Sequence, residues 1–228
     1  MDLRNLPRAA ETAAQKGHNQ FGKLPQWNLD DLYPGNESNQ LKLDLAKARA
    51  EAKAFETDYK GKLAALTAEG KLIEAITRYE ALSDLSGRLG SYAFLQYVRF
   101  TQDGARVKFL GDLSQSLTDL STGLIFFGLE LNRIDEAALE TAFAGSPELA
   151  RYRPWFEELR KAKPYQLDDR TEELFHEKSV TGAQAWNRLF DETMASLKFV
   201  VDGEDLNLEG VLNLLSDRDE TKREAAKG

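Results

Sequence analysis

Residues 72–101 read LIEAITRYEALSDLSGRLGSYAFLQYVRFT, and this stretch decides the fold. Its large apolar side chains recur every three or four residues, which places them on one stripe of an α-helix. The stretch contains no proline and is followed by Asp103 and Gly104, a pair typical of a turn. It therefore predicts one long amphipathic helix whose buried stripe consists of Leu72, Ile76, Tyr79, Leu82, Leu85, Leu89, Tyr92 and Leu95.

Two more amphipathic stretches flank this helix. Before it, apolar residues keep the same spacing over residues 41–66; Ser38 or Asn39 can cap the start, and Gly70 can end the helix. After it, residues 110–131 carry leucines at alternating steps of three and four, a heptad-like seam. Because short connections join antiparallel helices, the sequence predicts a mainly all-α fold built on three long antiparallel amphipathic helices.

Shorter helices follow the three long ones. Asp135 can cap a helix that ends at Gly145. Ser146 and Pro147 supply a cap and a first-turn proline for the next helix, and Pro164 breaks it. These signals predict helices over 136–145 and 147–163.

The next two helices are predicted from their caps. Asp168 can cap a helix over residues 169–180, with Leu174 and Phe175 expected to face inward. Residues 181–184 read TGAQ, which fits a capping box in which Gln184 reaches back to the cap. The helix that this box begins carries Trp186, Leu189, Phe190, Met194 and Leu197.

One small β-hairpin is predicted near 198–208. Residues 199–201 are Phe-Val-Val, and Asp202-Gly203 suits a type I′ turn because both central residues of that turn need a positive φ. Short helices over 208–216 and 219–227 follow.

The predicted elements divide the chain into three parts. They are a flexible leader (1–24), an extended segment with the three long helices (25–132), and the shorter helices with the hairpin (133–228). The extended segment, residues 25–35, is expected to be held to the body by its aromatic side chains.

The composition excludes several classes of site. The 228 residues contain no cysteine and two histidines, and the formal net charge is −8. Without cysteine there is no disulfide, thiolate metal site or cysteine nucleophile. The acidic balance argues against nucleic acid as a partner. The longest apolar run, residues 123–129, is too short to span a membrane, and we expect a cytoplasmic protein.

No catalytic, cofactor-binding or metal-binding residue can be assigned from motifs. His176-Glu177 resembles half of the zinc motif H-E-x-x-H, but the fourth residue after His176 is Val180. Residues 173–176 also match the Glu-x-x-His of di-iron bundles, which need a second such motif. The other histidine is His18. We therefore interpret His176 as a surface or helix-lining residue stabilised by Glu172 or Glu173.

Paired carboxylates and aromatic stripes have simpler interpretations than catalysis. Acidic pairs at helix starts or polar faces are expected to cap helices or stay solvated, and aromatics at helical spacing are expected to pack in the core. Some of these aromatics would line a cleft if the chain is one wall of a larger enzyme. The acidic pairs are Asp30-Asp31, Glu157-Glu158 and Asp168-Asp169, and the stripes are Tyr92-Phe94-Tyr97-Phe100 and Tyr152-Trp155-Phe156.

Six stretches together resemble the oligoendopeptidase F family, zinc metallopeptidases of the thimet oligopeptidase type. In order and spacing they cover residues 25–228. They are WNLDDLYP (27–34); YEAL (79–82) followed by GSYA (90–93); FFGLEL (126–131); residues 152–167; EEL (172–174) with TGAQAWNRLF (181–190); and DG (202–203), LLS (214–216) and REAA (223–226).

The resemblance implies a role without catalysis for this chain. It covers only the N-terminal helical region of that family, which forms one wall of a channel that admits short peptides. The zinc-binding H-E-x-x-H helix and the third zinc ligand of the family lie further along, so no cofactor is expected here and zinc is expected in a full-length parent. Residues 133–228 would then be the incomplete start of the region leading to a catalytic domain.

Two hypotheses remain open at this point. In the first, the chain is a fragment of a longer peptidase, whether from proteolysis, truncation or cloning; its partners are short peptides and the catalytic domain, and its exposed apolar surface causes self-association. In the second, the chain is an independent helical protein-interaction module with no catalytic activity, which holds a partner helix in an aromatic groove.

Overall fold

The computed structural model describes residues 26–227, which form two compact units. The larger unit comprises residues 29–186, and the smaller one contains residues 187–227 together with 26–28. The predicted leader, residues 1–24, lies outside the described residues. The mainly all-α fold with one hairpin is confirmed.

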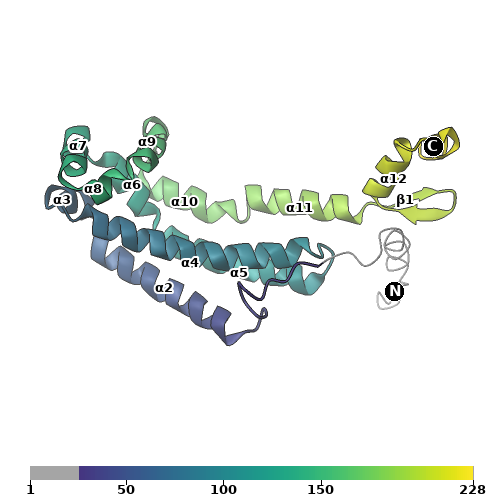
Figure 1. The fold of residues 1–228 in the computed structure, drawn as a ribbon, viewed down its shortest axis with the longest axis horizontal. Coiled ribbons are helices and arrows are strands. Elements are labelled where there is room, and N and C mark those ends of the chain that lie inside the picture. The colour runs from purple at the N-terminus through teal and green to yellow at the C-terminus, as the bar shows by residue number, and fades with distance from the viewer. Residues whose placement is uncertain (1–25, 228) are drawn as a thin grey trace. The chain divides into compact units, whose positions relative to one another are not determined.

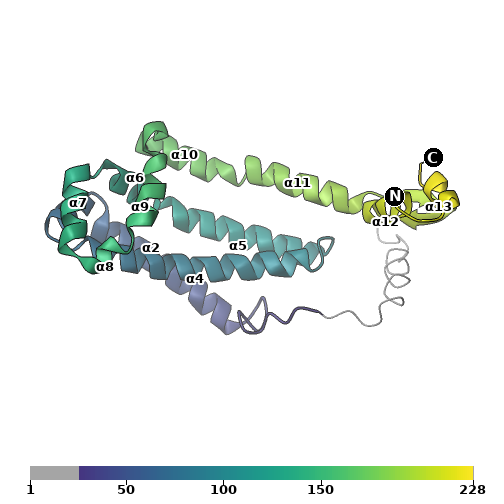
Figure 2. The ribbon, with the colours of Figure 1, turned by 45° about the horizontal axis from the view of Figure 1, so that its top comes forward.

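Three long helices form the body of the larger unit. They are α2 (Asn39–Tyr59), α4 (Leu72–Val98) and α5 (Gly104–Thr122), and they lie side by side in Figure 1 and Figure 2. The chain reverses direction between α4 and α5, where Asp103 caps α5 by accepting hydrogen bonds from the amides of Ala105 and Arg106. Helix α4 packs against both of the others, so the stretch that decides the fold is also its central element.

The shorter helices of this unit follow their predicted caps. They are α6 (Ile125–Arg133), α7 (Glu136–Gly145), α8 (Pro147–Ala150), α9 (Arg153–Lys161), the 3-10 turn η1 (Lys163–Tyr165) and α10 (Asp169–Ser179). Asp135 caps α7, Ser146 caps α8 and Asp168 caps α10, as predicted.

Three predicted helices are each divided in two. The helix expected over 41–66 ends at Tyr59 and resumes as α3 (Leu63–Ala68), because Gly61 adopts a φ of +79°. The seam over 110–131 is interrupted at residues 123–124, where the amide of Leu124 bonds the carbonyl of Ser121 in a tighter turn. The helix expected over 147–163 becomes α8 and α9, with Pro154 in the first turn of α9.

Aromatic side chains fill the core of the larger unit. Phe55 of α2 lies 5.2 Å from Phe127 of α6, ring centre to ring centre, and Tyr79 of α4 stacks on Phe127 at 4.4 Å. Both phenylalanines are almost fully buried. Ring pairs at these separations add to the stabilisation from burial, so this cluster joins α2, α4 and α6.

The segment before α2 is held by two buried side chains. Leu29 and Tyr33 are buried, and the Tyr33 ring meets the Tyr92 ring edge-on at 5.2 Å. The segment is therefore held by an aromatic residue, as predicted. Trp27, which falls in the smaller unit, is exposed.

The predicted orientation of α10 is wrong. Leu174 and Phe175 were expected to face inward, but they are 51% and 64% exposed. The capping box at 181–184 is also not formed, because Thr181 Oγ1 donates to the carbonyl of Lys178 and Gln184 Nε2 contacts Ser179 Oγ. Within the larger unit, these two apolar residues of α10 are therefore not buried.

The smaller unit contains the predicted hairpin. The boundary between the units falls within α11 (Ala183–Ser196), which leads to β1 (Phe199–Val201) and β2 (Glu204–Leu206). The strands pair antiparallel, with Val201 opposite Glu204, and Asp202 and Gly203 both have positive φ. Helix α12 (Leu208–Leu215) packs on the hairpin, and α13 (Glu220–Ala225) follows.

Candidate functional site

His176 bonds a different partner from the one expected. Its Nε2 lies 2.6 Å from Ser121 Oγ on α5. Ser121 Oγ in turn donates to the carbonyl oxygen of Thr118, at 3.0 Å. A hydroxyl has one proton to donate, so with that proton on the Thr118 carbonyl the imidazole N–H donates to Ser121, whereas the other tautomer accepts the serine proton. In either case the pair ties α10 to α5.

A cavity of about 510 Å³ adjoins this pair. Helices α4, α5, α6 and α10 line it, and its surface includes His176, Gln184 and Ser86. The buried Oγ of Ser86 has no hydrogen-bond partner among the described residues. No Asp, Glu, Lys or Arg side chain lines the cavity, so it offers little chemistry beyond polar contacts.

Asp168, Asp169 and Glu158, three of the paired carboxylates, cap a helix or form surface ion pairs. Asp168 accepts hydrogen bonds from the amide and hydroxyl of Thr171, which hold the pKa of its carboxyl below the usual value. Asp169 pairs with Arg133, which lowers the pKa of that carboxyl. Glu158 pairs with Lys161. None of these carboxylates lines any of three cavities found among residues 26–227.

The aromatic stripes divide between core and surface. Tyr92 and Phe156 are buried, as the core interpretation predicted, whereas Phe94 and Phe100 are exposed. Trp155 lies at the edge of the core, 5.1 Å from the Phe156 ring. The buried members of the stripes, Tyr92 and Phe156, thus have a structural role.

A polar cluster connects the segment before α2 to α4. Tyr33 Oη donates to Asp44 Oδ2 at 3.0 Å, and both residues are buried. Arg88 Nη2 also donates to Asp44 Oδ2, at 3.3 Å, and the Arg88 guanidinium lies over the Tyr33 ring. Burial, followed by the hydrogen bond to Asp44, raises the pKa of Tyr33 to about 12. The phenol is therefore a donor throughout the neutral range.

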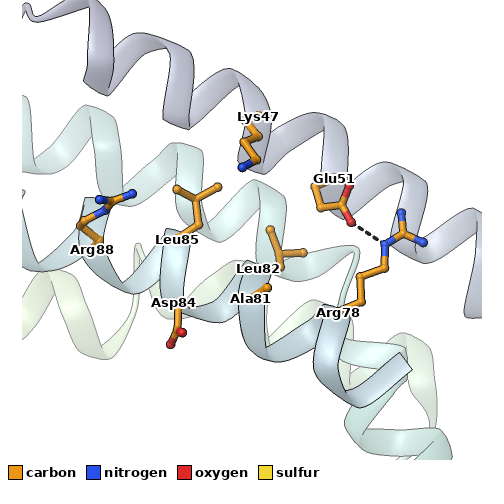
Figure 3. Close-up of a pocket in the computed structure, with 8 residues that line it drawn as sticks. All are labelled: Lys47, Glu51, Arg78, Ala81, Leu82, Asp84, Leu85 and Arg88. Atoms are coloured by element: carbon orange, nitrogen blue, oxygen red, sulfur yellow. Dashed lines mark hydrogen bonds and ion pairs between the residues drawn. The ribbon is translucent and has the colours of Figure 1, made fainter. Parts of the chain in front are cut away.

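Arg88 also lines a groove between α2 and α4 of the larger unit (Figure 3). The groove has a volume of about 600 Å³. Its floor is apolar, and three cationic and two acidic side chains surround it. The lining consists of Lys47, Glu51, Arg78, Ala81, Leu82, Asp84, Leu85 and Arg88.

The cationic side chains of the groove differ in how many carboxylates they contact. Arg78 is held by Glu51 and Asp58, which raise the pKa of its guanidinium further. Lys47 forms no ion pair within residues 26–227 and points from α2 toward α4 in Figure 3. The sequence interpretation missed this groove, although Arg78, Leu85 and Arg88 already lie at helical spacing on one face of α4.

The described residues provide no evident metal centre. Among residues 26–227, no group of three or more His, Cys, Asp or Glu side chains is placed to hold an ion. His176 and Glu177 thus have no third candidate ligand in this part of the chain. No helix among the same residues is long and apolar enough to cross a membrane.

Comparisons with known proteins agree on one family. The family model Peptidase_M3_N, described as Oligopeptidase F, matches residues 130–199. The curated oligopeptidase PepF of Bacillus subtilis (strain 168) is 29% identical over 156 residues, which are 67% of this chain and 22% of that protein. The chain therefore spans about a fifth of the length of this relative.

A solved structure shares the fold. The crystal structure of oligoendopeptidase-F from Enterococcus faecium matches with a TM-score of 0.69 at 21% identity. The match covers 83% of this chain and 38% of that one. The family-model match, the curated relative and the shared fold together confirm the resemblance seen in the sequence, which is to the N-terminal region of the oligoendopeptidase F family.

Proposed function

We propose that the chain is the non-catalytic helical region of a zinc metallo-oligopeptidase that hydrolyses short peptides. In this proposal it forms one wall of the substrate channel, limits substrate size and works in the cytoplasm. The observation that carries the proposal is the fold shared with oligoendopeptidase-F over 83% of the chain. The division at residues 132–133, between the long helices and the start of the region leading to the catalytic domain, belongs to the same proposal.

The exposed apolar side chains of α10 support the presence of another protein element that packs on this helix in the parent protein. Leu174 and Phe175 are exposed, and Leu167, two residues before α10 begins, is exposed as well. Contiguous apolar side chains at a surface mark a place where another protein element packs. We assign that place to the catalytic domain of the parent protein.

Zinc is assigned to the parent and not to these residues. A catalytic zinc site needs three protein ligands and an open position, and residues 26–227 offer no such cluster. We therefore assign no step of peptide hydrolysis to any side chain described here.

The experiment begins with the gene beyond codon 228. We expect an open frame that encodes H-E-x-x-H and a glutamate on a following helix. The longer protein should then contain stoichiometric zinc by elemental analysis and cleave fluorescence-quenched peptides, with activity that falls as the peptide lengthens. The 228-residue chain should show neither property.

Two results would contradict this proposal. Stoichiometric zinc or peptidase activity in the 228-residue chain would contradict the non-catalytic role. A native stop codon directly after codon 228 would favour the alternative, an independent interaction module that holds a partner helix in an aromatic groove.

A further inference from the structure

Helix α10 is amphipathic in the opposite sense from the other helices of its unit. None of its residues is buried, and its large apolar side chains, Leu174 and Phe175, are exposed. A helix ordinarily packs through its apolar stripe, whereas the half-buried residues of α10 are all polar. They are Thr171, Glu172, Glu173, His176 and Ser179.

The hydrophobic core of the larger unit contains no side chain from α10. The preceding helix, α9, contributes Phe156, which is 1% exposed, and Leu159 packs against the same core. No residue of α10 is buried in this core or packs against it. Because burial of apolar side chains supplies most of the free energy that holds a helix in place, α10 lacks the main contribution that fixes its neighbours.

Polar contacts attach α10 to the rest of the unit instead. Arg133 of α6 donates two hydrogen bonds to Asp169, and Lys60 at the end of α2 lies 3.9 Å from Glu173. Both ion pairs are exposed to solvent, and such pairs contribute little to stability. The contact between the imidazole and the serine of α5, described above, is the third attachment.

The segment before α10 is tied to α6. The side chain of Gln166 is half-buried, and its Nε2 donates to the carbonyl oxygen of Leu129 at 3.3 Å. The amide of Leu167 donates to Glu172 Oε1 at 2.9 Å, which fixes the entry into the helix. A movement of α10 away from α5 and α6 therefore turns about residues 166–168.

The cavity of about 510 Å³ lies next to α10 within the larger unit. His176 and Gln184 line one part of its wall, and residues of α4, α5 and α6 line the rest. Ser86 of α4 also lines it, and its Oγ is buried without a hydrogen-bond partner among the described residues. Departure of α10 would remove His176 from this wall and open the cavity to solvent.

We propose that α10 is a detachable lid, which leaves α5 and α6 as one unit and opens this cavity while the three long helices stay packed. Once detached, a helix of 11 residues is too short to stay helical in water by itself, so opening exposes all of its backbone amides. The lid goes beyond the proposed function and does not depend on it, because the test needs only this chain.

The first test is hydrogen exchange of backbone amides in the 228-residue chain, followed by NMR. We expect the amides of α10 to exchange together, at least about a hundredfold faster than those of α4, because a local opening needs less free energy than global unfolding. The difference from α4 should increase with salt, which screens the two ion pairs. Equal protection of α10 and α4 would overturn the proposal.

A matched pair of alanine variants distinguishes detachment of α10 from unwinding in place. His176→Ala removes the contact with Ser121 and should speed exchange in α10 about fivefold, although alanine is the better helix former. Glu177→Ala introduces the same residue at the next, exposed position and should not speed exchange. Equal effects of the two variants would contradict the lid. Unchanged protection of α4 confirms that both variants are folded.

A single thiol tests whether the opening reaches the cavity. The chain contains no cysteine, so Ser86→Cys gives one reactive site for a dithionitrobenzoate reagent, and adding His176→Ala should speed its labelling about fivefold. Ala93→Cys, buried on α4 outside the cavity, should react only as fast as the whole chain unfolds. Labelling of Ser86→Cys as slow as that of Ala93→Cys, or unaffected by His176→Ala, would overturn the proposal.

Discussion

The Tyr33 hydroxyl connects the segment before α2 to the helical body through one buried carboxylate. Asp44 receives hydrogen bonds from Tyr33 and Arg88, while Gln40 approaches at 3.4 Å. Removing one donor leaves a buried acceptor less satisfied, which costs more than the bond itself contributes. The sequence predicted that aromatics hold this segment, but it did not predict Asp44, because an aspartate inside an amphipathic helix is ordinarily solvated.

Tyr33→Phe should lower the free energy of unfolding by about 1 to 3 kcal/mol at neutral pH. Denaturant unfolding measures this change. Tyr165→Phe is the matched control, because the Tyr165 side chain is 82% exposed and the same substitution there should have no effect. Equal stability of both variants would contradict a structural role for the hydrogen bond to Asp44.

The raised pKa of Tyr33 also predicts a dependence of stability on alkaline pH. Below pH 10 the phenol is protonated in the folded and unfolded chains, so its contribution is complete. Above about pH 10 the unfolded chain loses this proton first, and the free energy of unfolding falls until the folded pKa of about 12 is passed. Unfolding curves between pH 8 and pH 11 should show a steeper loss for the natural chain than for Tyr33→Phe.

At the scale of the element, the sequence predicted where helices form, but it did not predict where a helix is interrupted. Apolar spacing and the caps Asp103, Asp135 and Asp168 correctly predicted where helices begin. The apolar stripe continues on both sides of Gly61, so spacing alone gave no signal of the break there. The exposure of Phe175 was likewise hidden, because an apolar face looks the same whether or not the chain contains its partner.

Two glycine substitutions should change stability in opposite directions. Gly61→Ala forces a side chain into a left-handed conformation, φ +79°, and should destabilise the chain by about 1 to 2 kcal/mol. Gly87→Ala lies inside α4, where an added methyl group meets nothing within 4 Å, and should stabilise it by about 0.5 to 1 kcal/mol. Thermal unfolding of the two variants tests this pair. A stabilising Gly61→Ala would show that α2 and α3 can join into one helix.

At the scale of the whole molecule, the chain carries an apolar surface that its described residues do not cover. The proposed location of the catalytic domain and the groove between α2 and α4 use different helices. Sequence reasoning predicted such a surface from the family resemblance but not its position. The structure locates this surface on α10 through the exposure of its side chains. Exposure depends on contacts between residues far apart in the sequence, which apolar spacing does not reveal.

Removing the exposed face of α10 should suppress self-association. The double variant Leu174→Ser, Phe175→Ser should reduce binding of a hydrophobic dye and shift sedimentation toward monomer. Its free energy of unfolding should change by only about 0.5 kcal/mol, because both side chains are exposed. Phe94→Ser, at a residue that is 53% exposed on α4, is the control and should leave association unchanged. A natural chain that is monomeric and binds no dye would refute the prediction.

The central position of α4 also has a consequence for synthesis on the ribosome. Helix α2 precedes α4 in the chain and α5 follows it, so α4 emerges with one partner already made and the other still to come. Each pairing joins neighbours in sequence, and such local pairings form quickly. The helical body can thus assemble in the order of translation, with α4 waiting only for the residues up to Thr122 before both of its sides are covered.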